Sequence, residues 1–146
     1  MQIRQATGQD VALVTAITRA AYTPWIAVIH REPLPMTVNY AEAIARHHID
    51  ILENPDPVAL IEMIPYPDHL WLENIAVHPD HQGQGLGKHL LAHAETTARN
   101  LNLPELRLLT NQAFTANLAF YRAQGFIQTD SRPFKSGFTA YFTKSL

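Results

Sequence analysis

The chain has 146 residues, of which 47% are hydrophobic and 16% charged, and its formal net charge is −2 at pH 7. This length favours a single domain spanning residues 1–146, with roughly 68–70% of the unfolded surface buried on folding. The weak negative charge argues against nucleic-acid binding and against attraction to an acidic membrane. The lack of cysteine excludes disulfides, thiolate zinc sites and a cysteine nucleophile.

The N-terminal segment has no signal-peptide core, and no uninterrupted apolar run approaches 18 residues. We therefore expect a soluble cytoplasmic protein without membrane association. A short strand is predicted over residues 1–6. A helix is predicted over 10–21, because Asp10 can cap it and apolar residues recur at helical spacing. Prolines at three positions argue against regular helix over 22–37.

A second helix is predicted over 38–47, with Thr37 as its N-cap. Two strands, 49–53 and 58–64, follow around a proline-containing turn, and a third covers 69–77.

The C-terminal half continues with a helix that starts at a glycine-rich loop and ends near Asn100, where a stripe including Leu86, Leu90 and Leu101 is apolar. A strand over 105–111, a helix over 115–124 and a closing hairpin over 126–143 complete the chain. The order β-α-α-β-β-β-α-β-α-β-β predicts a mixed α/β or α+β protein.

The glycine-rich loop, Gln-Gly-Gln-Gly-Leu-Gly over residues 82–87, lies between an apolar strand and a helix. Backbone N–H groups of such a turn and the positive end of the helix dipole converge on one point, which suits a phosphate or pyrophosphate. A glycine-rich turn without a ligand is the alternative. A Walker-type loop does not fit, because His89 follows Gly87-Lys88, and Lys88 also occupies the last glycine position of a dinucleotide fingerprint.

A second motif, Thr-Asn-Gln-Ala-Phe-Thr-Ala-Asn-Leu-Ala-Phe-Tyr-Arg-Ala-Gln-Gly-Phe over residues 110–126, follows the strand 106–109. Together with Glu-Asn-Ile-Ala-Val over 73–77 and the glycine loop, it resembles the GNAT superfamily of N-acetyltransferases, as a small bacterial-type member. The resemblance implies a GNAT-like fold: a central, mostly antiparallel sheet of about seven strands with a splayed parallel pair, flanked by about four helices.

The resemblance also implies acetyl-coenzyme A as co-substrate. The loop would hold its pyrophosphate through backbone amides, and strand residues 75–77 would present backbone groups to the pantetheine arm. Asn111 can bind the coenzyme or cap the next helix. The expected coenzyme-binding residues are Ile75, Ala76, Val77, Gln82, Gly83, Gln84, Gly85, Leu86, Gly87, Lys88, Asn111, Asn117 and Tyr121.

Acetyl transfer to an amine requires a proton acceptor, because an ammonium group cannot attack a thioester. Glu73 is the candidate base, directly or through water. Strand alternation predicts Glu73 on the same face as Trp71, Ile75 and Val77, where partial desolvation would favour base character. The alternative is a structural glutamate bonded to backbone.

The resemblance assigns oxyanion stabilisation to a backbone N–H near Val77 and the general-acid role to Tyr121. The ordinary pKa values of a phenol and a thiol, about 10 and 8.5, are close enough for proton transfer. Alternatively, the Tyr121 hydroxyl only orients the sulfur. Asn117 lies one helical turn before Tyr121, on the same face.

For the acceptor, the segment 22–36 is long enough to cover the site, which favours a small-molecule amine over a protein tail. Arg31 can fix a carboxylate and Glu32 a second cation, although a packed loop with solvated charges is the alternative. The candidate substrate residues are Tyr22, Trp25, Arg31, Tyr40 and Glu73.

No metal site is expected: His89 and His93 lack the zincin glutamate and are assigned to a solvated face. An acyl-coenzyme A sensor without turnover is the alternative function, but Glu73 and Tyr121 beside the loop favour catalysis. An exposed strand edge near residues 134–141 could pair with a second copy of the chain, so the sequence is compatible with a monomer and with a homodimer. It is also compatible with acyl donors longer than acetyl-coenzyme A.

Overall fold

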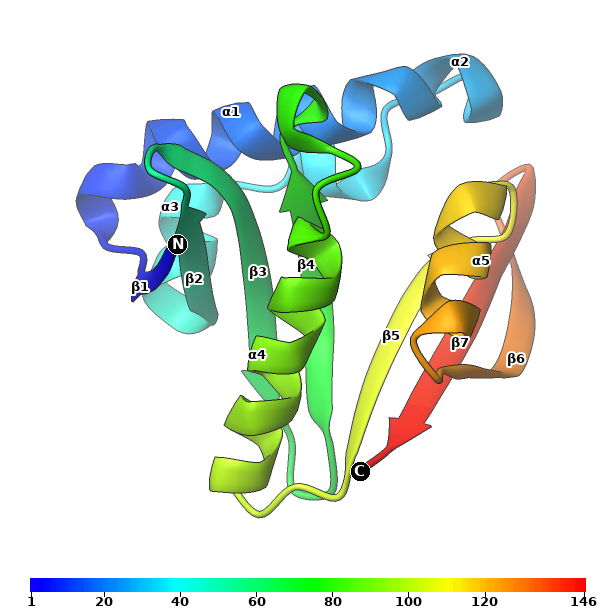
Figure 1. The fold of residues 1–146 in the computed structure, drawn as a ribbon. Helices are drawn as coiled ribbons and strands as arrows, with labels where there is room; N and C mark the ends of the chain where they lie inside the picture. Colours follow the sequence, from blue (N-terminus) through cyan, green and yellow to red (C-terminus); the bar gives the residue numbers. More distant parts are fainter.

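A computed structural model describes residues 1–146 and contains one seven-stranded sheet with the strand order β1-β2-β3-β4-β5-β7-β6. Every neighbouring pair is antiparallel except β4 and β5, which are parallel. The expected mixed fold is confirmed (Figure 1). The strands are β1 (Gln2–Gln5), β2 (His48–Glu53), β3 (Pro57–Pro65), β4 (Leu70–Val77), β5 (Glu105–Asn111), β6 (Ile127–Phe134) and β7 (Gly137–Ser145).

Helices cover both faces of this sheet and create two hydrophobic cores. The larger core lies under α4 and α5, and the smaller lies under α1 and α3. The central strand β3 is apolar along most of its length because it is buried on both faces. The helices are α1 (Val11–Tyr22), α2 (Ile26–Ile29), α3 (Tyr40–Arg46), α4 (Leu86–Asn100) and α5 (Thr115–Ala123).

Two helix boundaries differ from those predicted. The segment after α1 is partly helical, because Pro24 occupies the first turn of a 3-10 helix (Thr23–Trp25), where no backbone donor is needed, and α2 follows directly. Helix α3 begins at Tyr40, and its cap is Asn39 rather than Thr37. The Asn39 Oδ1 atom accepts from the N–H of Ala41 at 3.0 Å.

The helical stretch Gly8–Ile29 has 22 residues and contains an 18-residue window with a mean hydropathy of 1.4, so by length and composition alone it qualifies as a membrane span. A search for uninterrupted apolar runs misses such a stretch. This is weak grounds for a membrane role, because core helices of soluble proteins meet the same requirement. Val14 and Ile17 of this stretch are buried against the sheet.

The assignment of His93 to a solvated face is wrong, whereas His89 is exposed. The His93 ring nitrogen Nε2 lies 2.6 Å from Asp50 Oδ2, and the His48 Nε2 atom lies 2.9 Å from Asp50 Oδ1. Asp50 is buried in β2, so its carboxylate requires hydrogen-bonding partners there. The two histidines supply them and link α4 to β2.

The parallel strands β4 and β5 pair at only three positions, from Leu70–Leu106 to Leu72–Leu108, and then separate. Figure 1 shows the two strands close together near the C-terminus of the chain and apart beneath α1 and α2. The separation begins where Glu73 forms a β-bulge, since Glu62 of β3 pairs with Asn74 and the next residue pairs with Leu72.

This bulge changes which face each later side chain of β4 occupies. Before Glu73 the even-numbered residue Leu72 packs on the larger core, whereas after it the odd-numbered residues Ile75 and Val77 do. The prediction that Glu73 shares a face with Ile75 and Val77 is therefore wrong, because strict alternation does not survive an inserted residue.

We predict that Leu90→Ala lowers the free energy of unfolding by about 2–5 kcal/mol, because Leu90 is fully buried in the larger core. Leu101, expected on the same stripe, is 50% exposed because α4 ends at Asn100. Leu101→Ala is thus the matched control, with an expected change within about 0.5 kcal/mol. Urea denaturation followed by circular dichroism measures both, and equal losses would contradict the placement of the core.

Candidate active site

A cavity of about 550 Å³ lies between the end of β4, the start of α4 and one side of α5. Its walls are formed by the glycine loop, which exposes backbone, and by aromatic side chains. Of the predicted coenzyme-binding residues it contains Ile75, Val77, Gln82, Gly83, Gly85, Leu86, Gly87, Lys88, Asn117 and Tyr121.

The glycine loop gives this cavity its anion-binding character. Gly85 is the N-cap of α4 with a φ of 77°, in the left-handed region that residues with a Cβ rarely adopt. Gly87 allows close packing, since a Cβ there would lie 3.2 Å from Phe120 Cζ. The free N–H groups of the first turn and the positive end of the helix dipole therefore favour the binding of a negatively charged group in this cavity.

The edge of β4 that faces the gap carries free backbone groups. The carbonyl oxygens of Ile75 and Val77 accept side-chain hydrogen bonds, from the Tyr22 hydroxyl at 3.4 Å and from Gln82 Nε2 at 3.3 Å. The N–H of a strand residue points to the same side as its carbonyl, so both N–H groups also face the gap. Ala76 pairs with Leu60 of β3, and neither Ala76 nor Gln84 lines the cavity.

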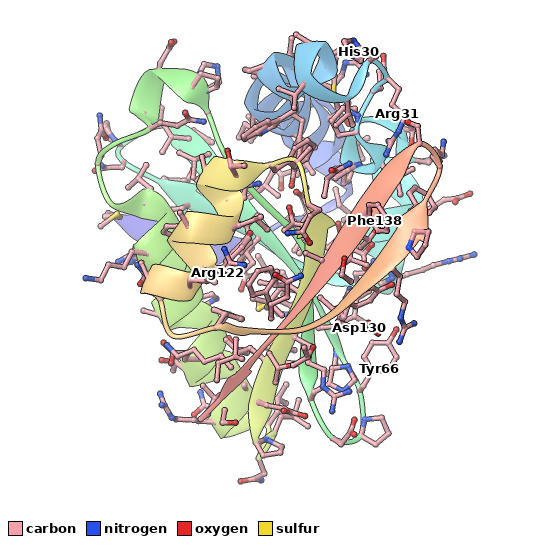
Figure 2. The ribbon with its side chains drawn as sticks, turned by 90° about the vertical axis from the view of Figure 1, so that its right-hand side faces the viewer. His30, Arg31, Tyr66, Arg122, Asp130 and Phe138 are labelled. Atoms are coloured by element: carbon pink, nitrogen blue, oxygen red, sulfur yellow. The ribbon has the colours of Figure 1, made fainter.

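A second cavity, of about 190 Å³, lies between α1, the segment after α2 and the tip of the β6–β7 hairpin. Figure 2 shows Arg31 beside this tip, and its guanidinium lies 5.7 Å from the Phe134 ring. Two carboxylates, Glu62 and Glu73, line the cavity, and much of the remaining wall is apolar. Arg31 forms no ion pair, whereas Glu32 pairs with Arg19 at 3.4 Å and lies outside the cavity.

The two cavities meet at Tyr22, which lines both of them. Its hydroxyl donates to Asn74 Oδ1 at 3.0 Å. The Asn74 amide in turn donates to the Thr18 hydroxyl at 3.2 Å and the Tyr40 hydroxyl at 3.3 Å. Burial raises the pKa of Tyr22 and of Tyr40 well above 10, so both phenols stay protonated at neutral pH.

Glu73 is exposed at the mouth of the smaller cavity, rather than partly desolvated as expected. The indole N–H of Trp71 donates to Glu73 Oε2 at 2.8 Å. The Trp71 bond occupies one side of Oε2, and the remaining oxygen positions of the carboxylate can accept a proton or a hydrogen bond from a ligand.

Tyr121 lines the larger cavity, and its ring packs edge-on against Phe126 at 5.7 Å between centroids. Its hydroxyl has no hydrogen-bond partner in the protein and no fully buried polar side-chain atom is unsatisfied, so this hydroxyl is open to the cavity. Burial raises the pKa of Tyr121 to about 12. Burial thus moves the phenol further from the pKa of a thiol, about 8.5, than an ordinary tyrosine, and the phenol is a protonated hydrogen-bond donor at neutral pH.

Two residues lie on the other side of the junction from the side predicted. Trp25, expected at the acceptor, lines the larger cavity and stacks on Phe114 with centroids 4.4 Å apart. Asn111, expected at the coenzyme, lines the smaller cavity, and its Oδ1 atom accepts from the Ala113 N–H at 2.9 Å. Asn111 therefore closes the turn before α5 and does not cap that helix, whose N-cap is Phe114 without a side-chain cap bond.

Two buried polar residues of the site, Glu62 and Asn74, were not recognised from the sequence. Glu62 had a readable signal, because it is the one charged residue within the apolar run 58–64. A charge in a strand that is buried on both faces requires a partner or a function. Asn74 lies in the strand motif 73–77, but the bulge at Glu73 decides which face of the sheet its side chain occupies, and the sequence does not show this bulge.

Comparison with known proteins agrees with this geometry. The sequence profile of the acetyltransferase (GNAT) family matches residues 14–126. The chain belongs to this family, and the resemblance seen in its motifs is confirmed.

Individual relatives share less than a third of their aligned residues with this chain. The amino-acid acetyltransferase of Serratia proteamaculans (strain 568) is 29% identical over 128 residues, which are 86% of this chain and 26% of that protein. The chain thus spans about a quarter of the length of the curated relatives that it matches.

Two solved structures illustrate the shared fold. The PaiA N-acetyltransferase from Thermoplasma acidophilum, in complex with coenzyme A, has a TM-score of 0.85 at 18% identity, covering 99% of this chain and 98% of that one. The ribosomal-protein-S18-alanine N-acetyltransferase from Escherichia coli has a TM-score of 0.79 at 23% identity, covering 99% and 92%.

We predict that Asn74→Ala destabilises the protein by about 1–3 kcal/mol, because it removes hydrogen-bonding partners of Tyr22, Thr18 and Tyr40 inside the core. Asn100→Ala, at the exposed end of α4, is the control and should change stability by at most about 0.5 kcal/mol. Urea denaturation measures both variants. An unchanged midpoint for Asn74→Ala would show that the network contributes nothing to folding.

Proposed function

We propose that the protein transfers the acetyl group of acetyl-coenzyme A to a primary amine of a small molecule, by direct attack in a ternary complex. The observation that carries this proposal is the junction at Tyr22, where the cavity with the glycine loop meets a second cavity containing carboxylates. A reaction between two bound molecules needs two such compartments in contact. Membership of the family and the coenzyme A in the Thermoplasma relative support it.

In this proposal the larger cavity holds the coenzyme. The loop amides and the α4 dipole bind its pyrophosphate, with added charge from Lys88. The free N–H and C=O groups of Ile75 and Val77 pair with the amides of the pantetheine arm, which replaces the missing strand in the gap. Asn117 and Tyr121, one helical turn apart on α5, face the same ligand.

The chemical steps use groups at the junction. Glu73 accepts a proton from the attacking amine, directly or through one water. The Val77 N–H stabilises the oxyanion that forms on the thioester carbonyl. Tyr121 is the general acid that donates to the departing sulfur, since its hydroxyl lines the cavity, is protonated at neutral pH and has no other partner in the protein.

The acceptor compartment suits a small zwitterionic amine. Drug-sized ligands occupy pockets of roughly 300–1,000 Å³, and a dry cavity of about 150 Å³ holds benzene. A volume of about 190 Å³ therefore fits a molecule of amino-acid size. The cavity wall carries two carboxylates that can bind the ammonium group of an acceptor. It also carries Arg31, which forms no ion pair and can bind the acceptor's carboxylate. The name of the Serratia relative, an amino-acid acetyltransferase, supports the same class.

Isothermal titration calorimetry with acetyl-coenzyme A tests the coenzyme site. We expect binding to the wild type and about tenfold weaker binding to Gly85→Ala, because forcing a Cβ into the left-handed region costs roughly 1–2 kcal/mol. Gly137→Ala is the control, since Gly137 has ordinary backbone angles and open space around it. No heat with the folded wild type would overturn the proposed function.

Release of free thiol from acetyl-coenzyme A, measured with a panel of amino acids and simple primary amines, tests the chemical roles. We expect Glu73→Gln and Tyr121→Phe each to lower kcat by about 100-fold while the coenzyme affinity stays near that of the wild type. Full activity of both variants on a verified acceptor would refute the assigned roles. Coenzyme binding without turnover of any amine would instead support a sensor.

A further inference from the structure

The proposed reaction removes two protons from the acceptor nitrogen. The amine enters at neutral pH as an ammonium ion and leaves as an amide, while a C–N bond forms and the C–S bond breaks. One proton ends on the sulfur: Glu73 takes it from the nitrogen, and Tyr121 supplies its equivalent to the leaving group. The other proton must leave before attack and must reach solvent, so the site needs a second acceptor with an exit.

Glu62 has the position of such an acceptor. It lines the smaller cavity from β3, directly beside Asn74 in the sheet, and its side chain is only 2% exposed. Its Oε2 atom lies 2.6 Å from His47 Nδ1. Its Oε1 atom has no partner in the protein and is not fully buried, because no fully buried polar side-chain atom is unsatisfied. This oxygen therefore opens toward the cavity.

His47 supplies the exit. Its side chain is 29% exposed at the end of α3, and Nε2 makes no hydrogen bond to the protein. His47 does not line the smaller cavity. A bound acceptor would cover Glu73 at the cavity mouth, whereas the outer nitrogen of His47 would stay in contact with water.

We infer that Glu62 is a second catalytic carboxylate, which takes the first proton of the substrate ammonium, and that His47 is a positioning residue that passes this proton to solvent. This inference rests on the proposed function. While Glu62 is ionised, His47 Nδ1–H donates to its Oε2 atom. After Glu62 takes the substrate proton, a ring flip turns the bare Nε2 of the neutral imidazole toward the carboxyl group. Nε2 accepts that proton while the outward-facing Nδ1–H releases one to water, so the pair returns to its starting charge.

The surroundings of Glu62 support this division between the two carboxylates. Burial raises the pKa of Glu62, His47 lowers it in part, and the nearby charge of Glu73 raises it further. The buried carboxylate is therefore the one whose surroundings favour holding a proton. A purely structural ion pair at Glu62 would not need a free oxygen facing a cavity.

A pair of amines of similar shape and different basicity tests the relay. Ethylamine is an ammonium ion at pH 7, whereas 2,2,2-trifluoroethylamine is largely neutral and needs no proton removed before attack. We expect Glu62→Gln to lower kcat/KM for ethylamine by about 100-fold and to leave trifluoroethylamine nearly unchanged. His47→Gln, which retains a donor toward Glu62, should show the same selectivity.

His48→Gln is the matched control, because His48 contacts Asp50 and lies outside both cavities. Thermal unfolding checks the fold of each variant, and His47→Gln carries the test if Glu62→Gln does not fold. Equal slowing of both amines in Glu62→Gln and His47→Gln would overturn the relay and leave the proposed function intact. A wild type that binds acetyl-coenzyme A but acetylates no amine would overturn both.

Discussion

The architecture depends on the early end of one strand pairing. Strands β4 and β5 share a ladder for three residue pairs and then diverge, at the position where Glu73 bulges out of β4. A parallel pair that stops short leaves unpaired donors and acceptors along an interior strand, and such groups require partners. The backbone of Ile75 and Val77 is thereby available at the centre of the molecule, where only a ligand, a side chain or water can complete its hydrogen bonds.

The same bulge also arranges the side chains around this opening. It turns Asn74 toward α1, where the Asn74 amide joins hydroxyl groups from α1 and α3, and it places Glu73 at a cavity mouth. The glycine loop then starts α4 at the open end of β4, so that a helix N-terminus and a free strand edge face one cavity. One inserted residue thus produces both the backbone surface and the polar junction.

Local sequence determines those parts of the larger cavity that the sequence analysis and the structure share. The loop 82–87 needs glycines for its own backbone angles, and the motif 110–126 places Asn117 and Tyr121 on one helical face, so short-range rules suffice for both. Glu73 was misplaced because alternation assumes an uninterrupted strand. Trp25 and Asn111 line a different cavity from most residues expected to share their ligand, since their positions depend on how α1 and the β6–β7 hairpin pack across the sheet. Glu62 and His47 are fifteen residues apart, and only strand register brings them together.

The sharing of Tyr22 between the two cavities has a thermodynamic consequence. A molecule in either cavity that restricts the orientation of this phenol also reduces the conformational freedom that the other molecule must remove. By linkage, the resulting coupling free energy is the same in both directions. If a ligand on one side displaces or fixes Tyr22, the affinity on the other side therefore changes by a common factor, whichever ligand arrives first.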